Sequence, residues 1–113
     1  MSSKARMYGI LLILFVVIGG VIAAGFWRSP EARKGRHLNR ADKYFQQQKY
    51  REAVIELRNV LQSEKTNARA IRQLGLAHYE LGELGHAARY LPKAKELHPD
   101  DPDVRLKLGT IYL

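Results

Sequence analysis

The chain has 113 residues and contains no cysteine. It therefore has no disulfide bond, no zinc site built on thiolates, no covalently attached c-type haem and no cysteine nucleophile. It also has no cysteine to carry the lipid of a bacterial lipoprotein. This absence leaves the compartment open, because proteins without cysteine occur in reducing and in oxidising environments.

Motifs for catalysis and for ligand binding are also missing. Gly82 and Gly85 are not followed by the Lys-Ser or Lys-Thr pair of a phosphate-binding loop. The histidines lie in separate segments, and none is paired with acidic residues at the spacing of metal ligands; they are His37, His78, His86 and His98. We therefore expect no enzymatic activity, no cofactor and no metal site.

Charged side chains are absent from residues 7–27, which read MYGILLILFVVIGGVIAAGFW. A helix over this run would be about 31 Å long, close to the hydrocarbon thickness of a bilayer. Phe26 and Trp27 near its end are residues that favour the membrane interface. We predict an N-terminal tail over residues 1–6, a transmembrane helix over 7–27 and a basic linker over 28–34.

A cleaved signal peptide is the alternative to this anchor. Lys4 and Arg6 precede the apolar run, and small residues near its end offer a cleavage site. The run is longer than the ~7–15 residues that are usual in a signal peptide, which favours an uncleaved anchor.

Small residues recur four positions apart within the apolar run. This spacing lets the backbone of a second helix approach closely. The alternative is that small residues are simply common in membrane spans. The predicted transmembrane packing residues are Gly19, Gly20, Ala23 and Ala24.

Positive charge dominates the rest of the chain. Residues 28–113 carry 17 of the 19 basic residues and all 11 acidic ones. This excess suits anionic headgroups, nucleic acid or acidic protein surfaces, and it is also ordinary for an unevenly charged helical surface. We favour the last interpretation and expect no nucleic-acid partner.

The same part of the chain repeats itself at an offset of 34 residues. Equivalent positions carry similar residues: Ala41, Gly75 and Gly109; Ala53 and Ala87; Leu57 and Leu91. A helical pattern with this period is typical of tetratricopeptide (TPR) repeats. We predict an all-α fold, in which a single transmembrane helix precedes a helix-turn-helix solenoid. The solenoid helices are expected at about 35–48, 50–63, 68–81, 84–97 and 102–113.

The segment LGLAHYELGELGHAARYLPKAKELHPDDPDV, residues 74–104, resembles a TPR motif closely. The resemblance implies a TPR domain over residues 35–113. Its parts are one repeat at about 34–67, a second at 68–101, and the first helix of a third at 102–113.

Three positions depart from the TPR pattern. His37 and Arg40 stand where bulky apolar residues are usual, so we expect an N-terminal edge that is loosely packed or capped by the membrane. Pro92 lies inside a predicted helix, where it removes one backbone hydrogen bond and predicts a kink. At the other end, residues 106–113 lack half of their apolar cover, which predicts either a longer native chain or a covering partner, and we favour the former.

TPR proteins usually bind partners on the concave face that is lined by the first helix of each repeat. Arg69 and Arg72 would suit an acidic or C-terminal carboxylate ligand. The alternative is that this face is only a solvated surface. The resemblance implies these partner-binding residues: Asp42, Phe45, Gln46, Arg69, Arg72, Leu76 and Tyr79.

Residues 29–62 resemble the start of bacterial exported TPR proteins, including large ones from exosortase loci. This resemblance implies a single-pass protein of the bacterial inner membrane with a periplasmic TPR domain. The basic flank after the span favours the alternative, a cytoplasmic domain.

The sequence is consistent with two functions. One is a membrane-anchored scaffold that recruits or assembles envelope proteins. The other is an accessory subunit whose single span packs into a larger membrane complex. The expected partners are other proteins, membrane lipid and a possible second transmembrane helix.

Overall fold

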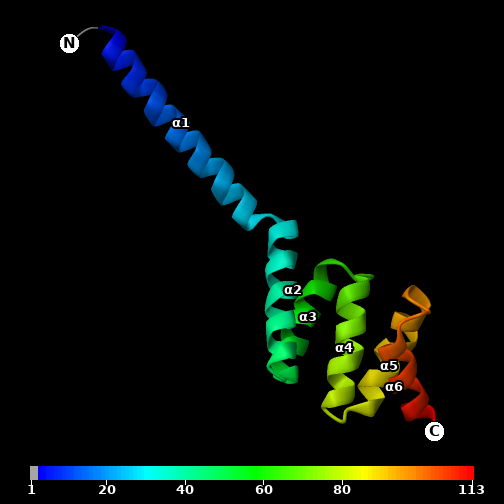
Figure 1. Ribbon diagram of the computed structural model, residues 1–113. Helices are drawn as coiled ribbons and strands as arrows, with labels where there is room; N and C mark the ends of the chain where they lie inside the picture. The colour runs from blue at the N-terminus through cyan, green and yellow to red at the C-terminus, as the bar shows by residue number, and fades with distance from the viewer. Residues whose placement is uncertain (1–2) are drawn as a thin grey trace. The chain divides into compact units, whose positions relative to one another are not determined.

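The computed structural model describes residues 3–113, and it divides after Arg33 into two compact units. Every regular element in the described residues is an α-helix, which confirms the predicted all-α class (Figure 1). The helices are α1 (Ser3–Arg28), α2 (Pro30–Gln46), α3 (Tyr50–Ser63), α4 (Ala68–Glu80), α5 (Leu84–Leu97) and α6 (Pro102–Tyr112).

The first helix is long and apolar enough to cross a membrane, and a signal sequence meets the same criteria. α1 contains 26 residues, which corresponds to about 39 Å of helix. It extends beyond the predicted 7–27 span at both ends. Residues 3–6 of the predicted N-terminal tail are helical, and residues 1–2 of that tail lie outside the described residues.

Local signals set the break between α1 and α2. The Ser29 hydroxyl donates to the carbonyl of Phe26 at 2.8 Å and accepts from the amide of Ala32 at 3.2 Å. Pro30 follows as the first residue of α2. Proline is tolerated there because the first N–H groups of a helix have no carbonyl partner within it. The residues of the expected basic linker, 28–34, are therefore helical except for Ser29, and the boundary between anchor and repeats stays a prediction.

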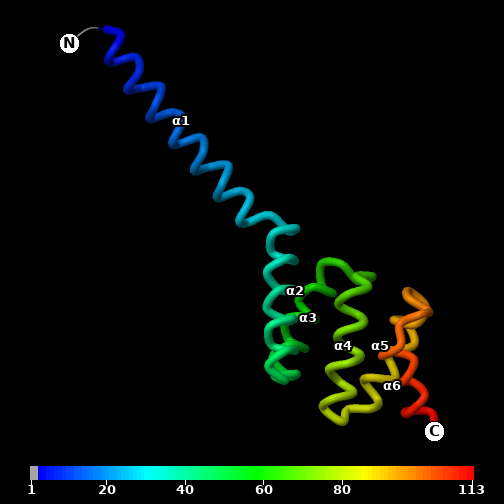
Figure 2. The backbone as a smooth tube through the Cα atoms, in the orientation of Figure 1, coloured from blue at the N-terminus to red at the C-terminus, as the bar shows by residue number. Residues whose placement is uncertain are grey.

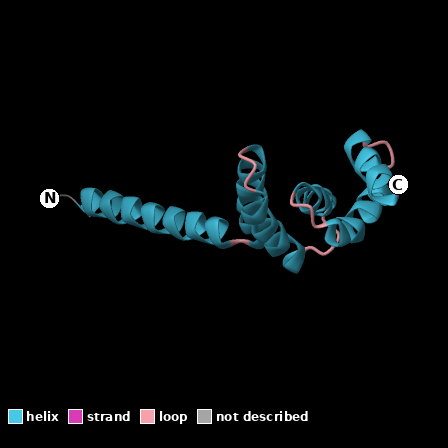
Figure 3. Cartoon of the chain, turned by 90° about the horizontal axis from the view of Figure 1, so that it is seen from below, coloured by secondary structure: helices cyan, strands magenta, loops and turns pink. Residues whose placement is uncertain are grey.

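The turns inside the repeats are equivalent at the 34-residue period (Figures 2 and 3). Gln48 and Gly82 both have positive φ, at 60° and 75°. The residue after each donates its amide to a carbonyl five positions back, Lys49 to Tyr44 at 2.8 Å and Glu83 to His78 at 2.9 Å. This left-handed residue closes the helix end and reverses the chain.

Helix starts are capped with the same period. The Asn67 side chain accepts from the amide of Ala70 at 2.9 Å and begins α4. Asp101, one repeat later, accepts from the amides of Asp103 and Val104 at 3.1 and 3.3 Å and begins α6. Short polar side chains are preferred at this position because they satisfy free amides of the first turn.

The core lies between successive helices of the repeats. Ala53, Leu57, Ala87 and Leu91 are all 0 % exposed, as the period predicts. Gly75 is buried too, and a Cβ built on it would lie 2.6 Å from Cδ2 of Leu91. Only glycine therefore lets α4 and α5 approach this closely without a shift.

The first repeat combines apolar and ionic packing. Leu38 and Ala41 are buried in the core. His37 Nδ1 lies 2.5 Å from Glu56 Oε2, and Arg40 Nη1 lies 3.5 Å from Glu56 Oε1. The two residues that depart from the TPR pattern thus share one carboxylate on α3, in place of the expected loose edge. In the second repeat, α5 remains helical on both sides of Pro92.

Candidate protein-interaction surfaces

Asp42 on α2 joins the first helices of two repeats. Its carboxylate forms an ion pair with Arg69 and accepts a hydrogen bond from Gln73 Nε2 at 2.5 Å, both from α4. Two of the predicted binding residues are thus engaged with each other within the chain.

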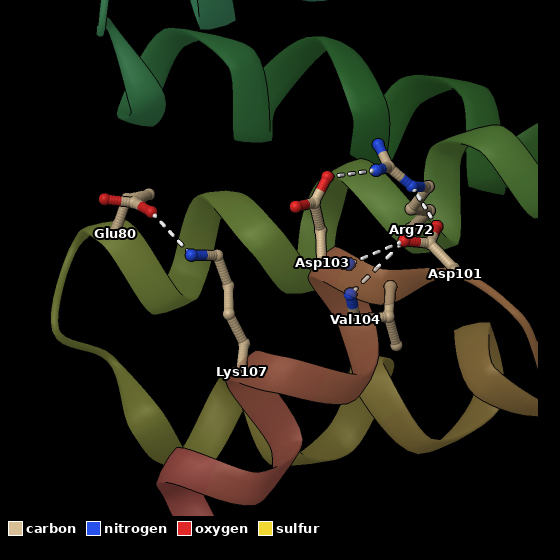
Figure 4. A network of polar contacts seen from close by, with 6 residues as sticks. All are labelled: Arg72, Glu80, Asp101, Asp103, Val104 and Lys107. Atoms are coloured by element: carbon tan, nitrogen blue, oxygen red, sulfur yellow. Dashed lines mark hydrogen bonds and ion pairs between the residues drawn. The ribbon is translucent and has the colours of Figure 1, made fainter.

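Arg72 joins α4 to the start of α6 (Figure 4). Its Nε lies 2.5 Å from Asp101 Oδ2, and its Nη2 lies 3.1 Å from Asp103 Oδ2. The hydrogen bond between Arg72 and Asp101 raises the pKa of the guanidinium and lowers the pKa of the carboxyl. Because Asp101 also caps α6, this contact fixes the place where that helix begins.

Lys107 makes the third connection between first helices. Its Nζ lies 3.3 Å from Glu80 Oε1 (Figure 4). The same nitrogen lies 4.6 Å from the centre of the Tyr79 ring. A cation over an aromatic face is attracted by the electron density of the ring. Lys107 therefore covers the ring face that we expected to be available to a partner.

We call these cross-repeat contacts the ion-pair ladder: Asp42 with Arg69, Arg72 with Asp101 and Asp103, and Glu80 with Lys107. Each pair is separated by about one repeat length. The sequence contains this signal as opposite charges 27–31 positions apart. An incoming carboxylate would have to share Arg69 or Arg72 with these carboxylates, because each guanidinium already has an acidic partner in the chain.

The other predicted concave residues lie in different environments. Leu76 is 4 % exposed and belongs to the core. Phe45 packs edge-on against Tyr50, with ring centres 5.2 Å apart. Gln46 is exposed. A role of the concave face in binding stays a prediction.

A groove lies on the C-terminal side of α5. It has a volume of about 460 Å³ and is lined by Pro92, Lys95, Glu96, Pro99, Leu108 and Tyr112. We call it the C-terminal groove. Leu106, Tyr112 and Leu113 on α6 and at its end are largely exposed, at 70 %, 69 % and 107 %.

The equivalent place one repeat earlier is filled by α5. Tyr90 packs against the core that α3 and α4 share. The ring of His78, the equivalent of Tyr112, stacks on His86 at 4.8 Å and on Tyr90 at 5.8 Å. A helix thus occupies the first of these two grooves through aromatic side chains beside Leu91.

The two equivalent glycines differ in the same way. A Cβ on Gly75 would collide with Leu91, whereas a Cβ on Gly109 has no atom within 4 Å among the described residues. Gly109 therefore has room for a large apolar side chain of the kind that Gly75 already receives.

His78 is an interior residue that the sequence did not single out. It is 3 % exposed, and its Nδ1 lies 3.4 Å from Glu83 Oε1. Burial lowers the pKa of the imidazole, so the ring is neutral at pH 7. Among residues 3–113, no three His, Cys, Asp or Glu side chains are arranged to hold a metal ion.

The predicted packing residues of α1 are all exposed: Gly19, Gly20, Ala23 and Ala24. A Cβ built on Gly19 or Gly20 has no atom within 4 Å in the described part of the chain. This leaves room for the close approach of another helix. Whether one binds there stays a prediction.

Residues 41–82 match the family model described as TPR repeat. The match covers the end of α2, all of α3 and α4, and the turn after α4. The paired helices α3 and α4 and the contact between Asp42 and Arg69 lie within it. The chain therefore contains a TPR repeat, a module that mediates interactions between proteins.

Proposed function

We propose that this protein is a membrane-anchored TPR scaffold that recruits or assembles other proteins of the bacterial envelope. The TPR repeat at residues 41–82 supports an interaction between proteins. The long apolar helix α1 supports an anchor. The proposed arrangement is a single pass through the inner membrane, with the repeats as the partner-binding part.

One observation supports the binding role most directly: the C-terminal groove repeats a site that a helix fills elsewhere in the chain. At the first site α5 inserts Leu91 against Gly75 and lays Tyr90 and His86 on His78. At the second site Gly109 and Tyr112 offer the equivalent surface. The groove therefore suits an amphipathic helix, from a partner protein or from this protein itself, that presents a leucine beside an aromatic residue.

A labelled peptide with the sequence of residues 84–97 tests this site, because it carries the Tyr90-Leu91 pair. Fluorescence anisotropy would measure its binding to the full chain in detergent. We expect binding to the wild type and about tenfold weaker binding to Gly109→Leu, which fills the space for the leucine. Gly85→Leu is the matched control, since Gly85 is also helical with nothing within 4 Å.

A second peptide, in which alanine replaces Leu91, should bind as weakly as the wild-type peptide does to Gly109→Leu. Equal binding of both peptides to all three chains would refute the proposed site. If Gly85→Leu loses binding as well, peptide binding depends on the overall stability of the chain and not on the groove.

The proposed orientation places the repeats in the periplasm. Lys4 and Arg6 precede the apolar stretch, and the resemblance of residues 29–62 to exported TPR proteins supports the same orientation. The basic residues after Arg28 favour the cytoplasmic alternative. Alkaline phosphatase fused after Leu113 should be active, whereas a fluorescent fusion without phosphatase activity would reverse the orientation.

An accessory subunit of a larger membrane complex is the second candidate function. The observation that favours it is the open surface around Gly19 and Gly20 on α1. Close approach of another helix at that surface would hold the chain in a complex through its span. The double substitution described in the Discussion separates this function from that of a recruiting scaffold.

A further inference from the structure

The imidazole of His78 on α4 is enclosed by groups from three other parts of the repeats. The residue is 3 % exposed, and its ring stacks on His86 and Tyr90 of α5 at 4.8 and 5.8 Å between ring centres. Its Nδ1 lies 3.4 Å from Oε1 of Glu83, in the turn before α5. Arg58 on α3 adds a positive charge that acts on the ring. The first half of α5 is thus packed on α4 through one buried titratable ring.

Protonation of this ring is unfavourable in the folded chain. Burial is the largest cause of the lowered pKa of His78, and the hydrogen bond with Glu83 opposes it. The charges of His86 and Arg58 lower the pKa further. The Nε2 atom is buried and has no hydrogen-bond partner among the described residues, so an N–H there would lack an acceptor. Acid therefore favours a conformation in which the ring reaches water.

The segment of α5 that covers His78 is weakly held. Ala87 is the one buried residue between positions 84 and 90. Glu83, which precedes α5, makes no capping hydrogen bond with its side chain, in contrast to the residues that precede α4 and α6. A segment with few buried apolar side chains and an uncapped end opens at a low free energy.

Pro92 separates this segment from the rest of α5. Proline has no N–H, so position 92 cannot donate the helical hydrogen bond to the carbonyl of Ala88. Helices bend most easily where such a bond is missing. Beyond Pro92, Ala94 belongs to the same core cluster as Val104 and Leu108 of α6, so the second half of α5 is held independently of His78.

The start of α6 also stays on α4 in mild acid. The hydrogen bond from Arg72 lowers the pKa of Asp101, so this carboxylate keeps its charge at pH values at which an imidazole gains a proton. The contact between Arg72 and Asp101 therefore persists while the contacts of His78 are lost.

We propose that residues 84–90 form an acid-sensitive latch, which releases from α4 when His78 gains a proton and which bends away at Pro92. This inference concerns contacts within the repeats and does not depend on the membrane anchor. Below about pH 6.5, the usual pKa of an imidazole in water, the ratio of open to closed latch should rise by up to about tenfold for each pH unit lost. Release uncovers the surface of α4 around His78, so mild acid gives the repeats a second conformation.

The absence of cysteine allows one spin label to be placed at a time in the full chain. Arg89→Cys places the label on the latch, and Lys93→Cys places it beyond Pro92. Both positions are exposed, and they share one face of α5 because they are four residues apart. Electron paramagnetic resonance in detergent measures the mobility of each label at about pH 7.5 and about pH 5.5.

We expect the mobile component of the Arg89→Cys label to increase reversibly, by about tenfold or more, at the lower pH. The Lys93→Cys label should keep its mobility. Equal mobilisation of both labels would refute the latch and indicate unfolding of the whole domain. An unchanged label at Arg89→Cys would refute it as well.

Two substitutions test the role of His78 itself. His78→Gln has no titratable ring, so the mobility of the Arg89→Cys label should no longer depend on pH. Glu83→Gln keeps the ring and removes the carboxylate that favours its charged form, so release should occur at a higher pH. If His78→Gln is already mobile at about pH 7.5, the Glu83→Gln variant decides, and unshifted release there would refute the role of His78.

His98→Gln is the matched control, because His98 is an exposed histidine that follows the last residue of α5. Release should keep its pH dependence in this variant, and its loss would assign the effect to the wrong end of the helix. Pro92→Ala tests the bend: alanine supplies the missing N–H, so release should require a lower pH. Unchanged release in Pro92→Ala would refute bending at this position.

Discussion

The two equivalent glycines Gly75 and Gly109 should respond oppositely to the same substitution. In Gly75→Ala the new Cβ would lie 2.6 Å from Cδ2 and 2.9 Å from Cγ of Leu91, and 3.3 Å from its backbone nitrogen. Leu91 is fully buried, so its side chain has no free space into which to move. Overpacking of a core costs typically about 1–3 kcal/mol.

Helix propensity acts in the other direction at both positions. Alanine is favoured over glycine by about 1 kcal/mol in a helix interior. Gly75→Ala should therefore lower the free energy of unfolding by a net value of about 0–2 kcal/mol. Gly109→Ala has no atom within 4 Å to meet, so it should raise this free energy by up to about 1 kcal/mol.

Thermal unfolding of the full chain in detergent, followed by circular dichroism, measures both effects. For a domain of this size, 1 kcal/mol corresponds to a change in Tm of about 4–8 °C. The expected result is a lower Tm for Gly75→Ala and a higher Tm for Gly109→Ala. A rise of Tm in both variants would refute the close contact between α4 and α5 at this position, because helix propensity alone would then explain the data.

Three further predictions use other parts of the chain. Gln48→Gly should raise the free energy of unfolding by roughly 0.5 kcal/mol in denaturant titrations, because relief of the left-handed conformation outweighs the added chain entropy, whereas Gly82→Ala should lower it. Burial lowers the pKa of His78 in the folded state, so the unfolded state binds more protons and stability should fall as pH drops below about 6.5. Denaturant titrations at about pH 7 and pH 5 should show a smaller loss of stability in His78→Gln, and an equal loss in both chains would count against this assignment. Gly20→Leu with Ala24→Leu should keep α1 in membranes after a carbonate wash and weaken association with a transmembrane partner; unchanged stoichiometry on co-purification would identify these residues as ordinary span composition.

Residues close together in the chain determined the helices and turns of this protein. The 34-residue period predicted α3, α4, α5 and α6 to within one residue, because apolar spacing and helix capping act over one or two turns. α2 begins five residues before the predicted start. At Gly82 the residue type alone predicts the turn, because glycine readily adopts a positive φ. The same signals were available at Ser29 and Pro30, where serine caps a helix and proline begins one, so the start of α2 at Pro30 was predictable from local chemistry.

The tertiary structure decided which side chains meet across repeats. Asp42 and Arg69 were each expected to face a partner, and they face each other. Arg72 was expected to hold a carboxylate, and it holds Asp101, which belongs to the chain itself. These pairs depend on the relative positions of α2, α4 and α6, which packing of the buried Leu and Ala residues determines, whereas the period fixes only the order of the helices. Gly75 and Gly109 are likewise equivalent in the sequence. In the fold, Leu91 packs against Gly75 and makes it a tight contact, whereas Gly109 has no atom within 4 Å among the described residues.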